Sequence, residues 1–336
     1  MIPQWNKSQT VTVIGAGVAG LCVATELLQR GITPQIIEAQ TEPGPASCSW
    51  WAGGMLSPLC EAESAEEAVT RYGKKAAAWW QSHTGLVKQN GSLVVALKRD
   101  HSDLNRFAKR TQDYELMDSA AIAALEPDLS GPFTQGLFYK SEAHLAPREA
   151  LTALKNNLLK QGVKFVYCAA QPETIAEHSL VVDCRGINAK NDTRGLRGVK
   201  GEMLILRCPD LAIQRPIRLL HPRIPLYIVP RGDGVYMLGA TMIESSAKTH
   251  ASVRSVMELL NAAYALNPAF GEAEILEIGV DSRPAFNDNL PKIRHRGHII
   301  TANGLYRHGF LLAPSLAIMV ANYIHTGTKP EWFESV

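Results

Sequence analysis

Short apolar runs and a helical repeat fill the first forty residues of the chain. Residues 10–15 (TVTVIG) are mostly β-branched and uncharged, which predicts a short buried strand. Leu21, Ala24 and Leu28 then recur at helical spacing and predict a helix with one apolar face. Residues 32–38 (ITPQIIE) predict a second strand, so the segment forms a βαβ unit of about 30 residues.

The strand–helix pattern returns twice later in the chain. A helix is predicted from Pro147, with three leucines on one face, and Gly162 ends it before a strand at 180–184. Residues 298–302 predict a further strand, followed by a glycine-bearing turn and a helix from about Leu312. These pieces predict one parallel sheet assembled from distant stretches of sequence.

A second kind of pattern separates these units. The predicted antiparallel strands are 201–208, 226–230, 235–241 and 274–281. A turn over 231–234 joins two of them, and a helix is expected near 253–265. The predicted fold is therefore α/β, with an antiparallel sheet inserted between the pieces of the parallel one.

The composition indicates a folded chain with enough apolar material for two domains. Hydrophobic residues make up 46% of the 336 residues and charged residues 20%, which excludes a disordered chain. Lys and Arg number 34 against 32 Asp and Glu, a formal charge of +2. So even a balance argues against a protein that binds nucleic acid or a membrane surface.

Cysteines and apolar stretches favour a cytoplasmic protein. None of the six cysteines forms a C-x-x-C pair or lies near a histidine at metal-ligand spacing, so reduced thiols and no metal site are expected. The N-terminus lacks the apolar run of a secretory signal. The most apolar stretch, 310–324, is shorter than a membrane span and is interrupted by Pro314 and Asn322.

Gly15, Gly17 and Gly20 form a G-x-G-x-x-G motif between the first strand and the first helix. The first glycine permits a tight turn, the second lets the backbone approach a pyrophosphate, and the third lets the helix pack on the strand. Glu38 ends the second strand, where a carboxylate accepts from ribose hydroxyls and repels a 2′-phosphate. A dinucleotide without that phosphate is the expected ligand.

A run of small residues favours FAD over NAD. A typical NAD dehydrogenase continues with further parallel units and a catalytic His or Lys, whereas this chain continues with SCSWWAGGML at 47–56. Consecutive small residues let the backbone lie flat against a planar ring such as an isoalloxazine. The alternative is a glycine loop packed beneath Trp50 and Trp51.

Four segments together resemble the D-amino-acid oxidase family of flavoproteins. They are the glycine motif, GGML at 53–56, VDCRG at 182–186 and NGLYRHGFLLAP at 303–314. Within this family the chain is most similar to the glycine oxidases of bacterial thiamine biosynthesis. The resemblance implies a GR2-type, Rossmann-like FAD-binding domain (1–82, 145–199 and 282–336) interleaved with an antiparallel-sheet α+β substrate-binding domain (83–144 and 200–281).

The same resemblance implies the site residues. Those expected along non-covalently bound FAD are Gly15, Gly17, Val18, Ala19, Gly20, Glu38, Ala39, Cys48, Ser49, Gly53, Gly54, Met55, Leu305, Tyr306, Arg307, His308, Gly309, Phe310 and Leu311. Tyr227, Arg283 and Arg307 match the family's ligands for the substrate carboxylate. No side chain is expected to act as a catalytic base.

Each carboxylate ligand also has a purely structural alternative. Arg283 is a permanently charged, forked group that matches a carboxylate, but a protein Asp or Glu would suit it equally well. Tyr227 could be a core residue with a satisfied hydroxyl, and Arg307 a surface residue. Among the ten histidines, only His308, beside the expected flavin turn, is retained as a candidate.

Two departures from the family pattern concern large side chains. Arg185 stands where the family has Thr, and we expect it either to turn to solvent or to contact the pyrophosphate. Trp50 and Trp51 replace smaller residues, so they either narrow the pocket or fill a domain seam.

The implied activity is FAD-dependent oxidation of glycine, and of other small amines, to the imine and glyoxylate with release of hydrogen peroxide. The glycine imine would supply the thiazole moiety of thiamine. Amino acid and oxygen are the expected partners, and the family suggests a homotetramer. Two other classes stay open: a related oxidase or dehydrogenase for sarcosine, D-amino acids or proline, and a non-catalytic FAD-binding protein.

Overall fold

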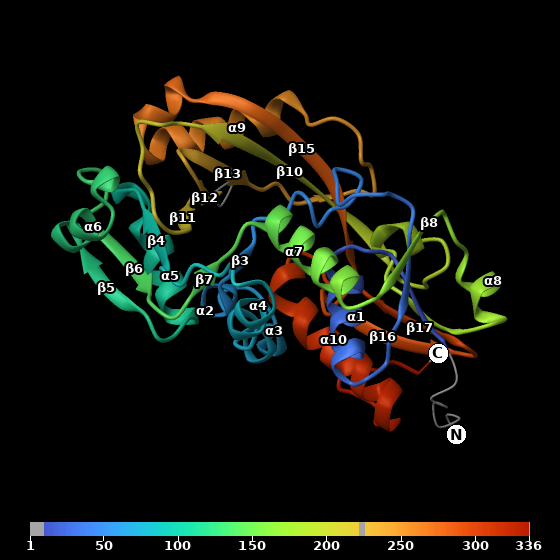
Figure 1. Cartoon of the computed structure of the whole chain (residues 1–336). Coiled ribbons are helices and arrows are strands. Elements are labelled where there is room, and N and C mark those ends of the chain that lie inside the picture. The colour runs from blue at the N-terminus through green and yellow to red at the C-terminus, as the bar shows by residue number, and fades with distance from the viewer. Residues whose placement is uncertain (1–9, 222–225, 336) are drawn as a thin grey trace.

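The computed structural model describes residues 10–221 and 226–335 and contains two large sheets (Figure 1). The first sheet has the order β16-β17-β9-β1-β2-β8. Its strands are β1 (Val11–Ile14), β2 (Gln35–Glu38), β8 (Lys164–Tyr167), β9 (Leu180–Asp183), β16 (Lys292–Arg296) and β17 (Ile299–Asn303). Neighbours are parallel except at one edge, where β16 runs antiparallel to β17. The parallel sheet assembled from distant pieces is confirmed.

Helices cover this sheet because their apolar faces need a partner. They include α1 (Val18–Gln29), α3 (Glu67–Gly73), α4 (Ala76–Thr84), α7 (Pro147–Lys160), α8 (Pro172–Ala176) and α10 (Gly309–Thr326). Val13 of β1, Leu21 of α1, Leu154 of α7 and Leu316 of α10 belong to one buried core. The side chains that the sequence predicted on the apolar faces of α1 and α7 therefore lie inside.

The second sheet has the order β14-β10-β13-β12-β11-β4-β6-β5, and β15 also pairs with β10. Its strands are β4 (Ser92–Ala96), β5 (Glu115–Asp118), β6 (Gln135–Tyr139), β10 (Arg197–Arg207), β11 (Ile217–Leu220), β12 (Leu226–Gly232), β13 (Val235–Gly239), β14 (Ile243–Glu244) and β15 (Glu274–Ala285). Its helices are α5 (His101–Arg110), α6 (Ser119–Leu125) and α9 (Val253–Leu266). The predicted α/β class is confirmed. The inserted sheet is antiparallel except between β4 and β11, which pair in parallel.

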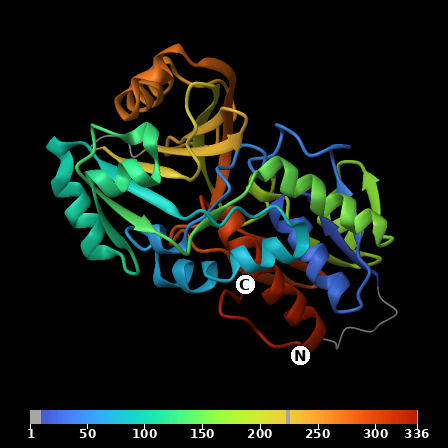
Figure 2. The same cartoon turned by 60° about the vertical axis from the view of Figure 1, so that its left-hand side comes forward.

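Short elements complete the chain. They are α2 (Pro58–Glu61), the pair β3 (Met55–Leu56) and β7 (Ala143–His144), and the 3₁₀ turns Lys98–Asp100, Pro127–Leu129, Gly186–Ala189 and Pro268–Glu272. Among them, α2, β3 and β7 lie between the sheets (Figure 1). Seen after a 60° turn, the two sheets and their helices form two lobes, with α9 in one and α10 in the other (Figure 2). The residue ranges of the two predicted domains stay a prediction.

The last helix differs from its prediction. It begins at Gly309 rather than near Leu312, and it runs through Pro314 without a break. A proline lacks the N–H that would bond to the carbonyl four residues earlier. Here Trp80 Nε1 donates to that carbonyl, Phe310 O, at 2.8 Å, so the carbonyl that proline cannot serve still has a hydrogen-bond donor.

By length and composition, α10 could cross a membrane: it has 18 residues and a mean hydropathy of 1.3. However, 72% of its residues are buried inside the protein. Its apolar side chains pack in the same core as those of α1 and α4. Burial against neighbouring helices accounts for its apolar composition.

A smaller difference concerns β2. The predicted strand 32–38 begins only at Gln35. Pro34 precedes it, and a proline cannot donate a hydrogen bond to a sheet ladder.

Candidate active site

The carboxyl ends of β1, β2 and β9 border a cavity of about 470 Å³. Ile14 at the end of β1 pairs with Ile37 on one side and Asp183 on the other. Parallel sheets bind ligands where the strand order reverses in this way. The volume lies within the roughly 300–1,000 Å³ of small-molecule sites.

The glycine motif gives this edge its close backbone packing. Gly15 has a φ of 99°, and a Cβ there would lie 2.7 Å from the carbonyl oxygen of Cys184. A Cβ on Gly20 would collide with the carbonyl oxygen of Gly15. Only glycine permits both approaches, which bring the N-terminus of α1 to the cavity. There Val18 N donates to Ser49 Oγ at 3.1 Å.

Glu38 ties the end of β2 to the glycine motif. Its carboxylate accepts from Ala16 N at 2.5 Å, from Ala39 N at 2.7 Å and from Gln40 N at 3.2 Å. Because Glu38 also lines the cavity, its carboxylate lies where the sequence placed a ribose ligand.

Most of the residues predicted along FAD, together with Tyr227 and Arg283, line this one cavity. The exceptions are Gly20, Gly54, Met55, His308 and Leu311. All of these except Gly20 line a smaller cavity of about 50 Å³, which shares Gly53, Tyr227 and Arg307 with the larger one. The predicted residues therefore gather at two adjoining cavities.

Arg283 extends over the backbone of β10. Its Nη1 donates to Thr241 O at 3.0 Å, and a Cβ on Gly201 would lie 2.7 Å from the same nitrogen. Arg283 forms no ion pair with any residue that the structure describes. The alternative of a structural ion pair is therefore wrong. The guanidinium lines the cavity, and so does the carboxylate of Asp281 two residues earlier on the strand, but the two form no ion pair.

Tyr227 lies on β12 at the junction of the two cavities. A Cβ on Gly53 would lie 3.1 Å from the ring, and one on Gly239 would lie 2.8 Å from its hydroxyl oxygen. Glycines on both sides thus make room for the half-buried ring beside the Gly53 segment.

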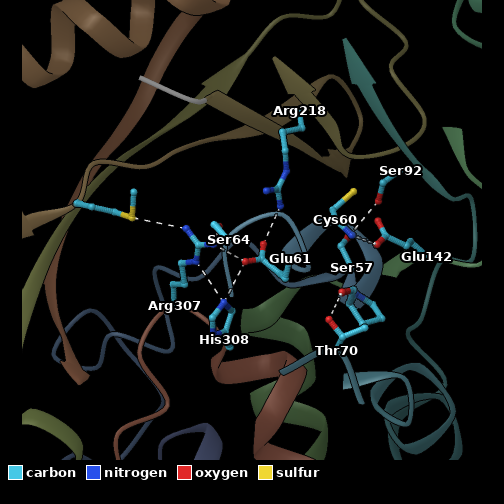
Figure 3. A network of polar contacts seen from close by, with 12 residues as sticks. Ser57, Cys60, Glu61, Ser64, Thr70, Ser92, Glu142, Arg218, Arg307 and His308 are labelled. Carbon is cyan, nitrogen blue, oxygen red and sulfur yellow. Dashed lines mark hydrogen bonds and ion pairs between the residues drawn. The ribbon is translucent and has the colours of Figure 1, made fainter. Parts of the chain in front are cut away.

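Arg307 belongs to a polar network centred on Glu61 of α2 (Figure 3). Its Nη2 lies 2.8 Å from Glu61 Oε2 and donates to Ser64 Oγ at 2.7 Å. Arg218 of β11 reaches the other carboxylate oxygen at 2.7 Å, and His308 Nε2 lies 3.0 Å from Oε2. The alternative of a surface arginine is wrong. Sequence reasoning missed both Glu61 and Arg218.

The charges in this network are unequal. Burial alone would raise the pKa of Glu61, but Arg307, Arg218 and the hydrogen bond from His308 hold that pKa well below its usual range. Burial, above all, lowers the pKa of His308, so its ring is neutral at pH 7. The cluster therefore contains two cations and one anion, and it joins α2, β11 and the start of α10.

Arg231 supports the Gly53 segment from behind. Its guanidinium donates to Leu145 O at 3.1 Å, Ala52 O at 3.1 Å and Gly53 O at 3.0 Å. Burial lowers the pKa of Arg231 to about 10, and it has no carboxylate partner among the described residues. Carbonyls that bind Arg231 cannot point into the cavity. The sequence assigned Arg231 to a turn and gave no sign of this contact.

Arg185 does not turn to solvent, so the first of its two expected positions is wrong, and contact with the pyrophosphate stays a prediction. Its side chain is 12% exposed, and its Nε and Nη2 both lie 2.9 Å from the carboxylate of Asp183. Asp192 accepts a further hydrogen bond from Nη2 at 2.8 Å. Arg185 still lines the large cavity, but two carboxylates already neutralise its charge.

The two adjacent tryptophans have different surroundings. Trp51 lines the large cavity and covers Gly279 of β15, where a Cβ would lie 2.7 Å from Trp51 Cδ2. Trp50 stacks with the guanidinium of Arg148 at 4.4 Å, and Arg148 forms an ion pair with Glu277 of β15 at 2.7 Å. Trp51 therefore narrows the cavity, while Trp50 fills a contact between α7 and the second sheet.

The cavity as a whole fits a flavin dinucleotide. It extends from Glu38 past the glycine motif to Tyr227 and Arg283. At both ends of the cavity a ligand can lie close to the backbone, and the N-terminus of α1 supplies N–H donors for phosphate. The first residue of α10, Gly309, borders both cavities and offers a second helix N-terminus.

Comparison with known proteins agrees with this geometry. The family model described as DAO, FAD dependent oxidoreductase, matches residues 10–323. A Rhizobium etli protein that carries the name thiamine biosynthesis oxidoreductase ThiO is 49% identical over 317 residues, which are 94% of this chain and 96% of that protein. Glycine oxidase of Geobacillus kaustophilus is 31% identical over 367 residues, covering 94% of this chain and 92% of its own.

Solved structures show the same fold. The crystal structure of glycine oxidase from Geobacillus kaustophilus superposes with a TM-score of 0.78 over 97% of this chain and 96% of that one, with 20% of superposed residues identical.

Proposed function

The chain belongs to the DAO family of FAD dependent oxidoreductases, and from this membership we propose that it oxidises glycine for thiamine biosynthesis. FAD is its cofactor. The names of the Rhizobium etli and Geobacillus kaustophilus relatives support this substrate and pathway. The observation that supports it most directly is Arg283, a guanidinium that lines the flavin cavity and forms no ion pair with a described residue.

The cofactor's place follows from the residues that line the cavity. Gly15 to Ala19 would hold the pyrophosphate, Glu38 the ribose, and the Gly53 segment the ring. When bound, FAD accepts the hydride of the amine and later passes the electrons on. We propose that it binds non-covalently, because burial raises the pKa of Cys48 to about 12 and keeps that cavity-lining thiol protonated.

We place the substrate where the two cavities adjoin, because Tyr227 lines both of them and Arg283 lines the larger one. Arg283 would take the carboxylate through two parallel hydrogen bonds, with Tyr227 beside it. At ~10–15 Å³ for each water-sized group, a cavity of about 50 Å³ holds roughly four such groups. That space suits glycine better than an amino acid with a long side chain.

Arg307 would act mainly through charge. Its Nη2 is engaged by Glu61, and its Nη1 meets the weak acceptor Met242 Sδ at 3.7 Å. Arg218 and Arg307 together outweigh Glu61, so the surroundings of the cavity favour an anionic substrate group.

The test is anaerobic addition of glycine, sarcosine or D-alanine to the purified yellow protein. Bleaching of the flavin by glycine at the lowest concentration, followed by peroxide on admission of air, would support a glycine oxidase. Bleaching by sarcosine or D-alanine alone would assign another substrate. Bleaching by glycine without peroxide would indicate a dehydrogenase, and no bleaching by any amine would favour a non-catalytic FAD-binding protein.

We further propose a cytoplasmic homotetramer whose two domains follow the ranges predicted from the sequence. Light scattering of the purified holoprotein would give its mass. Limited proteolysis would test the boundaries near residues 82, 145, 199 and 282.

A further inference from the structure

We propose that Asp281 binds the ammonium group of the substrate and accepts its proton, forming with Arg283 a two-point site for a zwitterionic amino acid. The proposal rests on the function proposed above and adds an amine-binding residue to it.

Asp281 and Arg283 lie two residues apart on β15, so their side chains point to the same face of the sheet. Both line the large cavity. Ser282 between them points the other way and donates to Ser245 O at 3.1 Å. Strand alternation thus places a carboxylate and a guanidinium side by side at the substrate end of the cavity.

Gly201 fixes how close the two groups are. Gly201 pairs with Asp281 across β10 and β15. The guanidinium of Arg283 occupies the space that a side chain at Gly201 would fill, and its Nη1 would lie 2.7 Å from a Cβ there. Directly opposite residues have Cβ atoms about 4.5–5.5 Å apart. Arg283 and Asp281 are therefore neighbours that form no ion pair with each other. A single α-amino acid, with its own carboxylate and ammonium group, can bridge them.

The carboxylate of Asp281 has an oxygen that needs a donor. The side chain is 4% exposed; Oδ1 accepts from Ser282 N at 2.7 Å and lies 3.5 Å from Lys248 Nζ. Oδ2 is buried and has no hydrogen-bond partner in the described part of the chain. A buried oxygen without a partner is costly, so a ligand with N–H donors would complete it.

The charged and titratable neighbours of Asp281 come from three segments. They are Cys48 after β2, Lys248 before α9, and Arg283 on β15 itself. Burial raises the pKa of Asp281 although Lys248 opposes the shift, which makes its carboxylate a better proton acceptor than an exposed one. In the proposed step one N–H bond of the ammonium breaks and one O–H bond forms on Oδ2. The neutral amine that remains can release a hydride from its Cα.

The test compares a ligand with an amine and one without. In the Asp281→Asn holoenzyme, the Kd of glycine is measured from anaerobic rapid-reaction flavin reduction, and the Kd of acetate from the flavin spectrum. Loss of one charge-assisted hydrogen bond predicts that glycine binds roughly ten- to a hundredfold more weakly. Acetate should bind equally or more tightly, because a negative charge next to Arg283 is removed. In addition, the acid limb of kcat/KM for glycine should disappear.

Glu274→Gln is the matched control. It removes a carboxylate from the same strand, where Glu274 is 65% exposed and lies 3.5 Å from Arg207, and both dissociation constants should stay unchanged.

Equal weakening of glycine and acetate binding would overturn the proposal and assign Asp281 to the fold. If the Asn variant does not retain FAD, Asp281→Glu replaces it. In that variant too, glycine must bind more weakly than in wild type while the Kd of acetate does not rise. If no amino acid reduces the wild-type flavin, the proposed function itself fails before any variant is compared.

Discussion

Replacing Gly201 by Ala would displace Arg283 without changing any charge. The added Cβ would lie 2.7 Å from Nη1 and closer still to Nη2 and Cζ, whereas ordinary contacts of this kind begin near 3.4 Å. The guanidinium must therefore retreat by at least about 0.7 Å, and further at Nη2. Gly201 lies inside β10 and does not have a positive φ, so the strand itself accepts alanine.

The expected loss follows from hydrogen-bond geometry. A hydrogen bond of about 2.9 Å from Arg283 to the substrate carboxylate, lengthened by about 0.7 Å, exceeds the limit of about 3.5 Å for a hydrogen bond. A charge-assisted bond contributes ~1.5–3 kcal/mol, so kcat/KM for glycine should fall roughly ten- to a hundredfold. Crowding within the sheet should also lower the free energy of unfolding by ~1–3 kcal/mol.

Steady-state glycine turnover at equal flavin content measures the first effect, and thermal unfolding the second. Gly198→Ala is the matched control on the same strand. Its Cβ would lie 2.6 Å from Ser246 Oγ and 2.7 Å from Ser246 Cα, so it crowds the sheet at least as much, but Gly198 does not line the cavity. A Gly201→Ala enzyme with kcat/KM within twofold of wild type would refute the placement of Arg283. So would an equal loss of kcat/KM in Gly198→Ala.

Three further substitutions test the site. Arg283→Lys keeps the charge but not the two parallel bonds, so kcat/KM should fall roughly ten- to a hundredfold with FAD retained; near-normal glycine turnover would remove Arg283 from the site. Glu61→Gln leaves two buried cations without their anion and should cost ~3–5 kcal/mol in urea unfolding at pH 7. Because the folded pKa of Glu61 is depressed, its contribution is present above its unfolded pKa, about 4.3, and is lost as the pH falls through the folded value. The difference from wild type should therefore narrow in acid, and a constant difference would contradict this reasoning. Gly309→Val adds a branched side chain at the start of α10, where even a Cβ lies 3.5 Å from Val18 Cγ1; weaker FAD or sulfite binding is expected, and unchanged titrations would rule out this helix as the partner of the flavin charge.

The sequence predicted those parts of the fold in which local periodicity and burial agree. The first βαβ unit, α7 and α9 each show one apolar face, and each lies close to its predicted range. Strand β4 (SLVVA) is buried at every position, so it has no alternation to detect. Strand β5 is mostly exposed and presents no apolar face. Neither strand was predicted, for opposite reasons.

The site residues, too, were predictable only where they are close to one another in the sequence. The glycine motif and Glu38 are close in sequence, and their spacing alone indicated their positions. Glu61 meets residues 157 and 247 positions away, and no local pattern records such a contact. Asp281 was a signal that could have been used, because two polar residues separated by one position on a strand share a face. The turn predicted over 231–234 begins two residues too early, because Arg231 and Gly232 belong to β12. The contacts of Arg231 with Ala52 and Gly53 depend on tertiary structure.

The strand order of the first sheet has a consequence for synthesis on the ribosome. Strand β9 lies between β1 and β17, and α10 packs on α1, so β9 and α1 each need a partner that is synthesised more than a hundred residues later. A nascent chain that ends before residue 299 leaves one edge of β9 unpaired and the apolar side of α1 uncovered. Such edges and faces invite aggregation and chaperone binding. We therefore expect stable uptake of the flavin to require synthesis of β17 and α10, so that chains truncated before residue 299 should be colourless.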